Sequence, residues 1–126
     1  MMGVYRGFRD LKVYQLAYNL AGEIFDVSRT FPKEEQYSLT DQIRRASRSV
    51  PVNISEAWGK RIYPRHFILK LTDAKGETAE TTVWMDFSLH HQYINQKTHH
   101  YFLNKYTEVS KMLSSMINHP EKFCRQ

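Results

Sequence analysis

The stretch that decides the fold is QIRRASRSVPVNISEAWGKR, from Gln42 to Arg61. Its apolar residues keep helical spacing across Pro51, although a proline inside a helix removes one backbone hydrogen bond and costs about 3 kcal/mol. The pattern stays in phase from Val50 to Ile54. We therefore expect one helix, kinked at Pro51 and held by packing. Two separate helices that meet at Val50-Pro51 are the alternative, because a residue before proline avoids helical geometry.

Helical spacing extends over three further segments, and nothing of comparable length alternates as a strand would. The expected helices run from Asp10 to Arg29, from Ser38-Leu39 to Gly59, from Pro64 through Leu89, and from Asn95 to Asn118. Joined by short turns, they predict an all-α, antiparallel up-down-up-down four-helix bundle. We expect residues 1–126 to form one domain, with 1–9 and 119–126 as flexible ends.

The first helix carries two apolar stripes where a bundle seam needs one. One stripe is Leu11, Tyr14, Tyr18, Ala21 and Phe25. The other is Val13, Ala17, Leu20, Ile24 and Val27. The second stripe gives the first helix more apolar surface than the bundle core needs. We therefore expect this surface to contact a partner.

The other helices carry one stripe each. In the second helix it is Leu39, Ile43, Ala46, Val50, Ile54 and Ala57. In the third it is Phe67, Leu71, Ala74, Thr78, Thr81, Met85 and Leu89. In the fourth it is Phe102, Tyr106, Val109, Leu113 and Met116.

Polar residues mark the expected helix starts. Asp10 and Asn95 are typical N-cap residues, and the run from Ser38 to Asp41 resembles a capping box. Gly76 costs about 1 kcal/mol relative to alanine in a helix interior, so we expect a close helix crossing there. Simple tolerance of that cost is the alternative.

The net charge of +5 is concentrated in one quarter of the chain. The segment from Arg44 to Lys75 contains eight basic residues and only two acidic ones, whereas the rest of the chain is close to neutral. Such asymmetry is typical of a surface for an anionic partner. The candidate nucleic-acid-binding residues are Arg44, Arg45, Arg48, Lys60, Arg61 and Arg65.

Three of these arginines fall opposite the apolar stripe of the second helix and point away from the core. Helical spacing pairs Asp41 with Arg45 and Glu56 with Lys60. Guanidinium groups suit phosphates, and the interleaved Trp58 offers a face on which bases stack, as does Tyr63. The alternative is a solvated basic face with Trp58 closing the end of the bundle.

Motifs for several common chemistries are absent from the sequence. It has no GxGxxG, no phosphate-binding loop, no HExxH, no paired CxxC, and no glutamate three residues before a histidine. The pairs His90-His91 and His99-His100 flank a turn, and we expect exposed residues there rather than a metal site. We expect no catalytic residues, no cofactor and no metal.

The composition also indicates in which cellular environment the chain folds. Hydrophobic residues make up 41% of the sequence, which is enough for a core, and no apolar run is long enough to span a bilayer. Cys124 is the single cysteine, which favours a reducing, cytoplasmic setting. We expect no membrane association.

Two segments, FRDLKVYQLA and TFPKEEQYSLTDQIRRASRSVPVNISEA, resemble the four-helix-bundle proteins encoded in intervening sequences of bacterial 23S ribosomal RNA genes. The family pattern is approximately [FY]-x-D-L-x-V-W-x-x-A, followed by F-P-x-x-E-x-x-x-L-x-x-Q-[IL]-R-R-A-x-x-S-[IV]-P-x-N-I-A-E-G. Residues that match it include Phe8, Asp10, Leu11, Phe31, Pro32, Glu35, Gln42, Arg44, Arg45, Pro51, Asn53 and Glu56. The resemblance implies an antiparallel bundle that forms homo-oligomers, as pentameric rings. A related accessory protein of diversity-generating retroelements binds nucleic acid and a reverse transcriptase.

The leading hypothesis is a non-enzymatic, oligomeric helical bundle that binds RNA or DNA through the basic surface on the second helix and the turn after it. The alternative is a protein-interaction scaffold whose arginines pair with acids of a neighbouring subunit or of a protein partner, with no nucleic acid bound.

Overall fold

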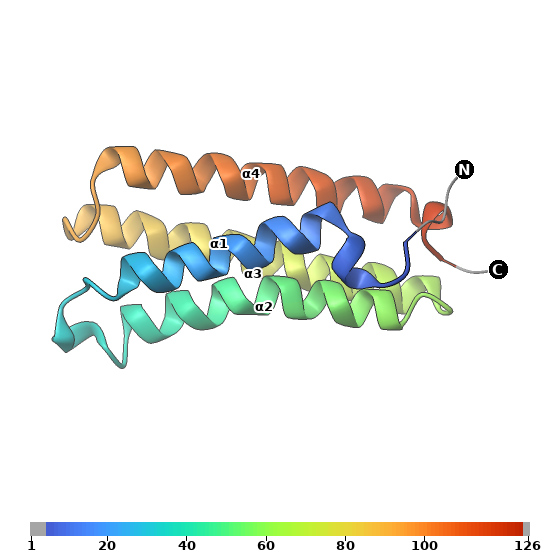
Figure 1. Cartoon of the computed structure of the whole chain (residues 1–126), viewed down its shortest axis with the longest axis horizontal. Helices are drawn as coiled ribbons and strands as arrows, with labels where there is room; N and C mark the ends of the chain where they lie inside the picture. Colours follow the sequence, from blue (N-terminus) through green and yellow to red (C-terminus); the bar gives the residue numbers. More distant parts are fainter. Residues whose placement is uncertain (1–4, 125–126) are drawn as a thin grey trace.

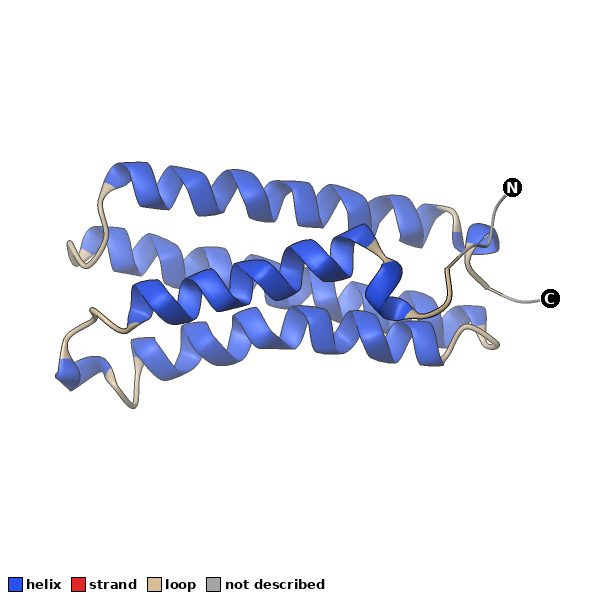
Figure 2. Cartoon of the chain, in the orientation of Figure 1, coloured by secondary structure: helices blue, strands red, loops and turns tan. Residues whose placement is uncertain are grey.

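The computed structural model describes residues 5–124, and all regular structure in that range is helical, as Figure 2 shows. The main helices are α1 Lys12–Ser28, α2 Leu39–Gly59, α3 Pro64–His90 and α4 Gln96–Asn118. Short 3₁₀ helices flank them: η1 Phe8–Asp10, η2 Lys33–Glu35 and η3 Pro120–Lys122. The predicted all-α four-helix bundle is confirmed, and consecutive helices run in alternate directions (Figure 1).

The neighbours of each helix follow from this course. α2 packs against α1 and α3, and α4 packs against α3 and α1. No Cα atom of α1 lies within 8 Å of one of α3 in the described chain, so these two helices occupy diagonal corners of the bundle. Among the same residues, no helix has both the length and the hydropathy needed to cross a bilayer.

α2 runs without interruption across Pro51, so the alternative of two separate helices is wrong. Polar side chains add hydrogen bonds to the neighbouring turns. Asn53 Nδ2 donates to the carbonyl of Ser49 at 2.9 Å, and Ser55 Oγ donates to the carbonyl of Val52 at 2.7 Å. Pro51 itself is buried, which allows tertiary packing to offset the missing backbone hydrogen bond. The kink stays a prediction.

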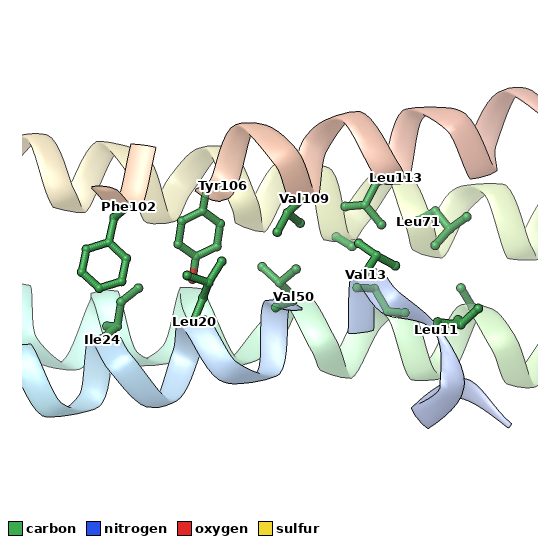
Figure 3. Packing of buried hydrophobic residues seen from close by; sticks show 14 of the residues in the cluster. Leu11, Val13, Leu20, Ile24, Val50, Leu71, Phe102, Tyr106, Val109 and Leu113 are labelled. Carbon is green, nitrogen blue, oxygen red and sulfur yellow. The ribbon is translucent and has the colours of Figure 1, made fainter. Parts of the chain in front are cut away.

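The core takes one stripe from each helix (Figure 3). The predicted stripes of α2 and α4 are buried throughout. In α3 the prediction holds as far as Met85, but Ser88 is buried in the last turn and Leu89 is only half-buried. The core residues of α1 are Val13, Ala17, Leu20, Ala21 and Ile24, with Leu11 just before the helix.

Leu11 and Ala21 of the surplus stripe of α1 are buried, and its aromatic residues stay at the surface. Tyr18 is 61% exposed, and Tyr14 and Phe25 are half-buried. Because α1 packs only against α2 and α4 among the other main helices, this face lies on the outside of the bundle.

The helix starts follow the predictions only in part. Asn95 caps α4, because its Oδ1 accepts a hydrogen bond from the backbone nitrogen of Thr98 at 2.8 Å. Asp10 is not the cap of α1: that position is Leu11, which has no side-chain cap. The Asp10 carboxylate instead accepts from the backbone nitrogen of Arg6 at 2.7 Å, across the 3₁₀ turn.

The start of α2 is held by Glu35 rather than by Ser38, whose side chain makes no cap bond. Glu35 accepts from Ser38 Oγ at 2.6 Å and from the backbone nitrogen of Leu39 at 3.3 Å. Its other oxygen accepts from the Tyr93 hydroxyl at 2.8 Å. These bonds, with Ser38 contributing most and Tyr93 next, lower the pKa of Glu35. One carboxylate thus joins the start of α2 to the turn between α3 and α4.

Aromatic residues close the other end of the bundle. The Tyr5 ring lies 5.9 Å from the Trp58 ring and 6.0 Å from the Phe123 ring, and Phe123 lies 6.1 Å from Phe67. Segments that were expected to be flexible, 5–9 and 119–124, therefore pack against the helices. Their flexibility stays a prediction, and residues 1–4 and 125–126 lie outside the described range.

Gly76 does not mark a close helix crossing, so that expectation is wrong. It is exposed on α3, and a Cβ added there would meet no atom within 4 Å. We predict that Gly76→Ala raises the free energy of unfolding by about 1 kcal/mol, because alanine loses less backbone entropy in a helix. Urea denaturation measures this change, and a fall in stability would contradict the open space around the residue.

Glu35 makes stability depend on pH. Its pKa is lowered in the folded protein, so its contribution is present above its ordinary value of 4.5 and is lost as the pH falls through the folded value. We predict that Glu35→Gln lowers the free energy of unfolding by about 1 kcal/mol at neutral pH and by almost nothing in acid. The exposed neighbour Glu34, changed to glutamine, is the control. Thermal unfolding across the acid range checks this, and parallel curves for Glu35→Gln and wild type would disprove it.

Tyr106 reaches from α4 across the core to Leu20 of α1 (Figure 3). Its hydroxyl has no hydrogen-bond partner among the described residues, and burial raises its pKa. We predict that Tyr106→Phe raises the free energy of unfolding by about 1 kcal/mol, because it removes a buried polar atom that is not hydrogen-bonded. Tyr101→Phe is the contrasting control, since the Glu23 side chain interacts with the Tyr101 hydroxyl and raises its pKa. Equal effects of the two changes on the urea midpoint would count against this account.

Candidate nucleic-acid interface

Three guanidinium groups surround one aromatic ring at the junction of α1 and α2. The Cζ atoms lie 4.5 Å from the centre of the Phe25 ring for Arg44, 5.6 Å for Arg48 and 5.7 Å for Arg29. The negative face of an aromatic ring attracts cations at such distances. We call Arg29, Arg44 and Arg48 the arginine cluster.

Arg44 is the fixed member of the arginine cluster. Its Nε donates to Ser28 Oγ at 2.8 Å, and Ser28 Oγ donates to the carbonyl of Phe25 at 2.9 Å. Ser28 is buried at the end of α1, and Arg44 is half-buried. This chain of bonds holds the guanidinium over the ring through its Nε.

The arginine cluster has no acidic partner in the described chain. The ion pairs of residues 5–124 involve other groups, and none includes Arg29, Arg44 or Arg48. The nearby acids of α1, Glu23 and Asp26, line a different hollow between α1 and α4. Three clustered cations without a carboxylate create a positive potential that an anion would relieve.

An apolar groove of about 490 Å³ begins at Arg48 and runs between α1 and α2. Its lining residues are Phe8, Tyr14, Tyr18, Ala21, Gly22, Phe25, Arg48, Pro51, Val52 and Ser55. No carboxylate is among them. The surplus stripe of α1 therefore forms one wall of a groove whose charge comes from arginine.

The six candidate residues do not form one cluster. Arg44 and Arg48 lean toward α1, and Arg45 lies on the side of α3. There it lowers the pKa of Glu77, although burial has the larger effect and the pKa of that carboxyl is raised overall. No ion pair between Asp41 and Arg45 occurs within the described range.

Lys60 follows the end of α2, about 18 Å along the helix axis from Arg48. Arg61 lies in the next turn, and Arg65 lies in the first turn of α3. Lys60 and Arg65 are exposed. The Arg61 guanidinium lies 3.6 Å over the Trp58 ring, and its Nε donates to the Trp58 carbonyl at 2.9 Å.

Trp58 is covered by Arg61 on one face and forms a T-shaped contact with the Tyr5 ring. The ring therefore closes the end of the bundle, which favours that alternative over base stacking. Tyr63 remains 60% exposed.

The expected pair between Glu56 and Lys60 is replaced by one across helices. Lys70 Nζ of α3 lies 2.8 Å from Glu56 Oε1 and 3.7 Å from Asp73 Oδ2. The hydrogen bond that Lys70 donates to the Glu56 carboxylate raises the pKa of Lys70. Lys70 is thus neutralised, and its charge adds little to a basic surface.

The histidines near the turn between α3 and α4 contact other residues. His99 Nε2 lies 2.8 Å from Asp86 Oδ1, and His100 Nε2 lies 3.0 Å from Asn104 Nδ2. Within residues 5–124 no three metal-binding side chains converge on a common point. Burial raises the pKa of the Cys124 thiol, which disfavours the nucleophilic thiolate.

Comparison with known proteins agrees with the fold and the arrangement of helices. A family model described as 23S rRNA-intervening sequence protein matches residues 9–115. The chain belongs to this family. It is also similar to the 1.70 Å crystal structure of a protein of unknown function from the S23 ribosomal protein family of Bacteroides thetaiotaomicron VPI-5482. The two chains are 28% identical, the match covers 84% of this chain and 95% of the other, and the TM-score is 0.76. No curated protein matches.

In this member of the 23S rRNA-intervening sequence family, two residues that carried the resemblance have clear structural contacts. Glu35 joins the start of α2 to Tyr93, and Arg44 bridges α2 to Ser28 of α1. Arg44 is therefore both a packing residue and a candidate ligand for an anion.

The sequence analysis did not predict that Phe25 would contact cations, and it did not include Arg29 or Ser28 in the candidate site. A usable signal was present, because an antiparallel hairpin brings the end of α1 beside the start of α2. Phe25 and Arg29 are four residues apart, as are Arg44 and Arg48, so each pair lies on one face of its helix.

Proposed function

We propose that this protein is a non-enzymatic, oligomeric helical bundle that binds nucleic acid, RNA in the first place, through phosphates at the arginine cluster. The observation that carries the proposal is the convergence of Arg29, Arg44 and Arg48 on Phe25 without a carboxylate among the described residues. Guanidinium groups bind phosphate oxygens through paired hydrogen bonds. A cytoplasmic setting fits such a role.

Lys60, Arg61 and Arg65 extend this basic surface toward the far end of α2. They lie too far from the arginine cluster to share one phosphate, but a strand that follows the helix would meet both groups in turn. Oligomers would repeat the surface and multiply weak contacts, as in a pentameric ring.

A second candidate is an interaction scaffold in which the arginines pair with acids of a neighbouring copy. The outer face of α3 supports it, because Val83 and Phe87 are exposed there and Asp73 and Glu80 lie on the same side. α1 and α3 occupy diagonal corners, so contact between these two faces would be head-to-tail and could close into a ring. The carboxylates of one copy would then neutralise the arginine cluster of the next.

Charge reversal separates the two candidates. We predict that Arg44→Glu combined with Arg48→Glu weakens RNA binding by more than about tenfold at low salt and flattens the dependence of affinity on salt. The subunit number should stay unchanged. Fluorescence anisotropy across a salt series and native mass spectrometry measure the two effects.

Lys111→Glu on the exposed face of α4 is the matched control, and circular dichroism verifies that each variant is helical. Unchanged RNA affinity in the double variant would refute the proposal. Dissociation of the oligomer without any loss of RNA binding would establish the scaffold instead.

A further inference from the structure

A row of aromatic rings follows the groove along the outer face of α1. The Phe8 and Tyr14 rings meet edge to face with centres 5.0 Å apart. The Tyr14 and Tyr18 rings are stacked at 5.9 Å with an angle of 28° between their planes. Phe25 continues the row two helical turns beyond Tyr18. Because Tyr18 is 61% exposed, part of this aromatic surface is open to a ligand.

Arginines stand at both ends of the row. The Arg9 guanidinium lies 4.5 Å from the centre of the Phe8 ring, and the arginine cluster surrounds Phe25. The groove between these ends contains no carboxylate. A ligand that spans it would meet cations at its two ends and flat apolar rings between them.

We propose that this groove binds nucleic acid as a single strand, with unstacked bases against the α1 rings and phosphates at the arginines. The proposal rests on the function proposed above and specifies the form of its ligand. In a duplex the bases stack on one another and their faces are hidden, whereas a single strand can lay its bases on aromatic side chains. From Tyr14 to Phe25 the row is about 16 Å long, which accommodates a few nucleotides.

The sequence indicated Trp58 as a stacking surface for bases, whereas the proposed stacking surface is the row of aromatic rings on α1. Trp58 is covered by Arg61 and Tyr5, whereas Tyr18 is open and lies in the groove that begins at Arg48. Phosphate contacts alone would not distinguish a strand from a duplex. The aromatic wall is the part of the site that makes this distinction.

The first test compares one strand in two forms. A fluorescent oligouridylate of about 12 nucleotides is titrated alone and after annealing to oligoadenylate, at the same salt concentration. We expect the free strand to bind about tenfold more tightly than the duplex. Equal binding of both forms would overturn the single-strand proposal and leave the phosphate-binding function standing. Binding of neither form would overturn both.

The second test uses two exposed tyrosines. Tyr18→Ala should weaken binding of the free oligouridylate by about tenfold and leave duplex binding unchanged. Tyr37→Ala is the matched control, because Tyr37 is 87% exposed and lies outside this groove. An equal effect of the two changes, or no effect of either, would overturn the proposal.

Two helical glycines supply a further matched pair. A Cβ at Gly22, inside the groove, or at Gly76, on α3, would meet no atom within 4 Å. Both changes to glutamate improve helix propensity and add the same charge, so both variants should fold. Gly22→Glu should weaken oligouridylate binding by about tenfold, and Gly76→Glu should not. If Gly22→Glu alters the native mass and leaves oligouridylate binding intact, the groove is a contact between copies and the proposal is wrong.

Discussion

A four-helix core accepts one apolar stripe from each helix, and α1 carries two. Val13, Ala17, Leu20 and Ile24 enter the core with Leu11 and Ala21, so the aromatic residues of the second stripe stay at the surface. Its aromatic members form one wall of the groove between α1 and α2. Exposed apolar surface of this kind on a small protein usually marks a binding site. The groove, its aromatic row and the position of Phe25 all result from the second apolar stripe of α1.

The arginine cluster depends on the same stripe. Phe25 remains half-buried on the outer face of α1, where it attracts cations from both helices of the hairpin. Arg44 is held there by Ser28, so part of the rotamer entropy that a ligand would otherwise remove is already lost. Like charges repel one another, and no carboxylate in the described residues relieves that repulsion at this site. Electrostatics and shape therefore favour an anionic, partly apolar partner.

The two ends of the bundle hold the groove in a defined form. At one end, the Glu35 carboxylate ties the start of α2 to Tyr93 in the turn between α3 and α4. At the other, the Tyr5, Trp58 and Phe123 rings pack together, and Arg61 covers Trp58. α2 is thus anchored on both sides of Pro51, which lines the groove.

Apolar periodicity, glycine and proline determined the four helices, their order and most of their core residues without any coordinates. Pro64, Gly59 and Asn95 mark real boundaries because capping and proline geometry are local effects. Asp10 failed as a cap because its carboxylate bonds to the backbone of Arg6, four residues earlier, which is a local competition between two possible partners. Gly76 failed as a crossing because it faces away from the neighbouring helices, and a Cβ there would meet no atom within 4 Å. The second failure depends on what lies nearby in space, which spacing along the chain does not encode.

The features of the candidate site also fall into two groups, those that the sequence determined and those that depend on the tertiary structure. The sequence determined that excess positive charge gathers on α2 and the turn after it, because composition and helical phase are properties of the chain alone. Only the tertiary structure decided what each cation contacts: Lys70 pairs with Glu56, Arg61 covers Trp58, and Arg29 joins Arg44 and Arg48 at Phe25. The physical reason is that ion pairs and cation–π contacts act over a few ångströms. The packing of α1 against α2 sets those distances, and no spacing within one helix does.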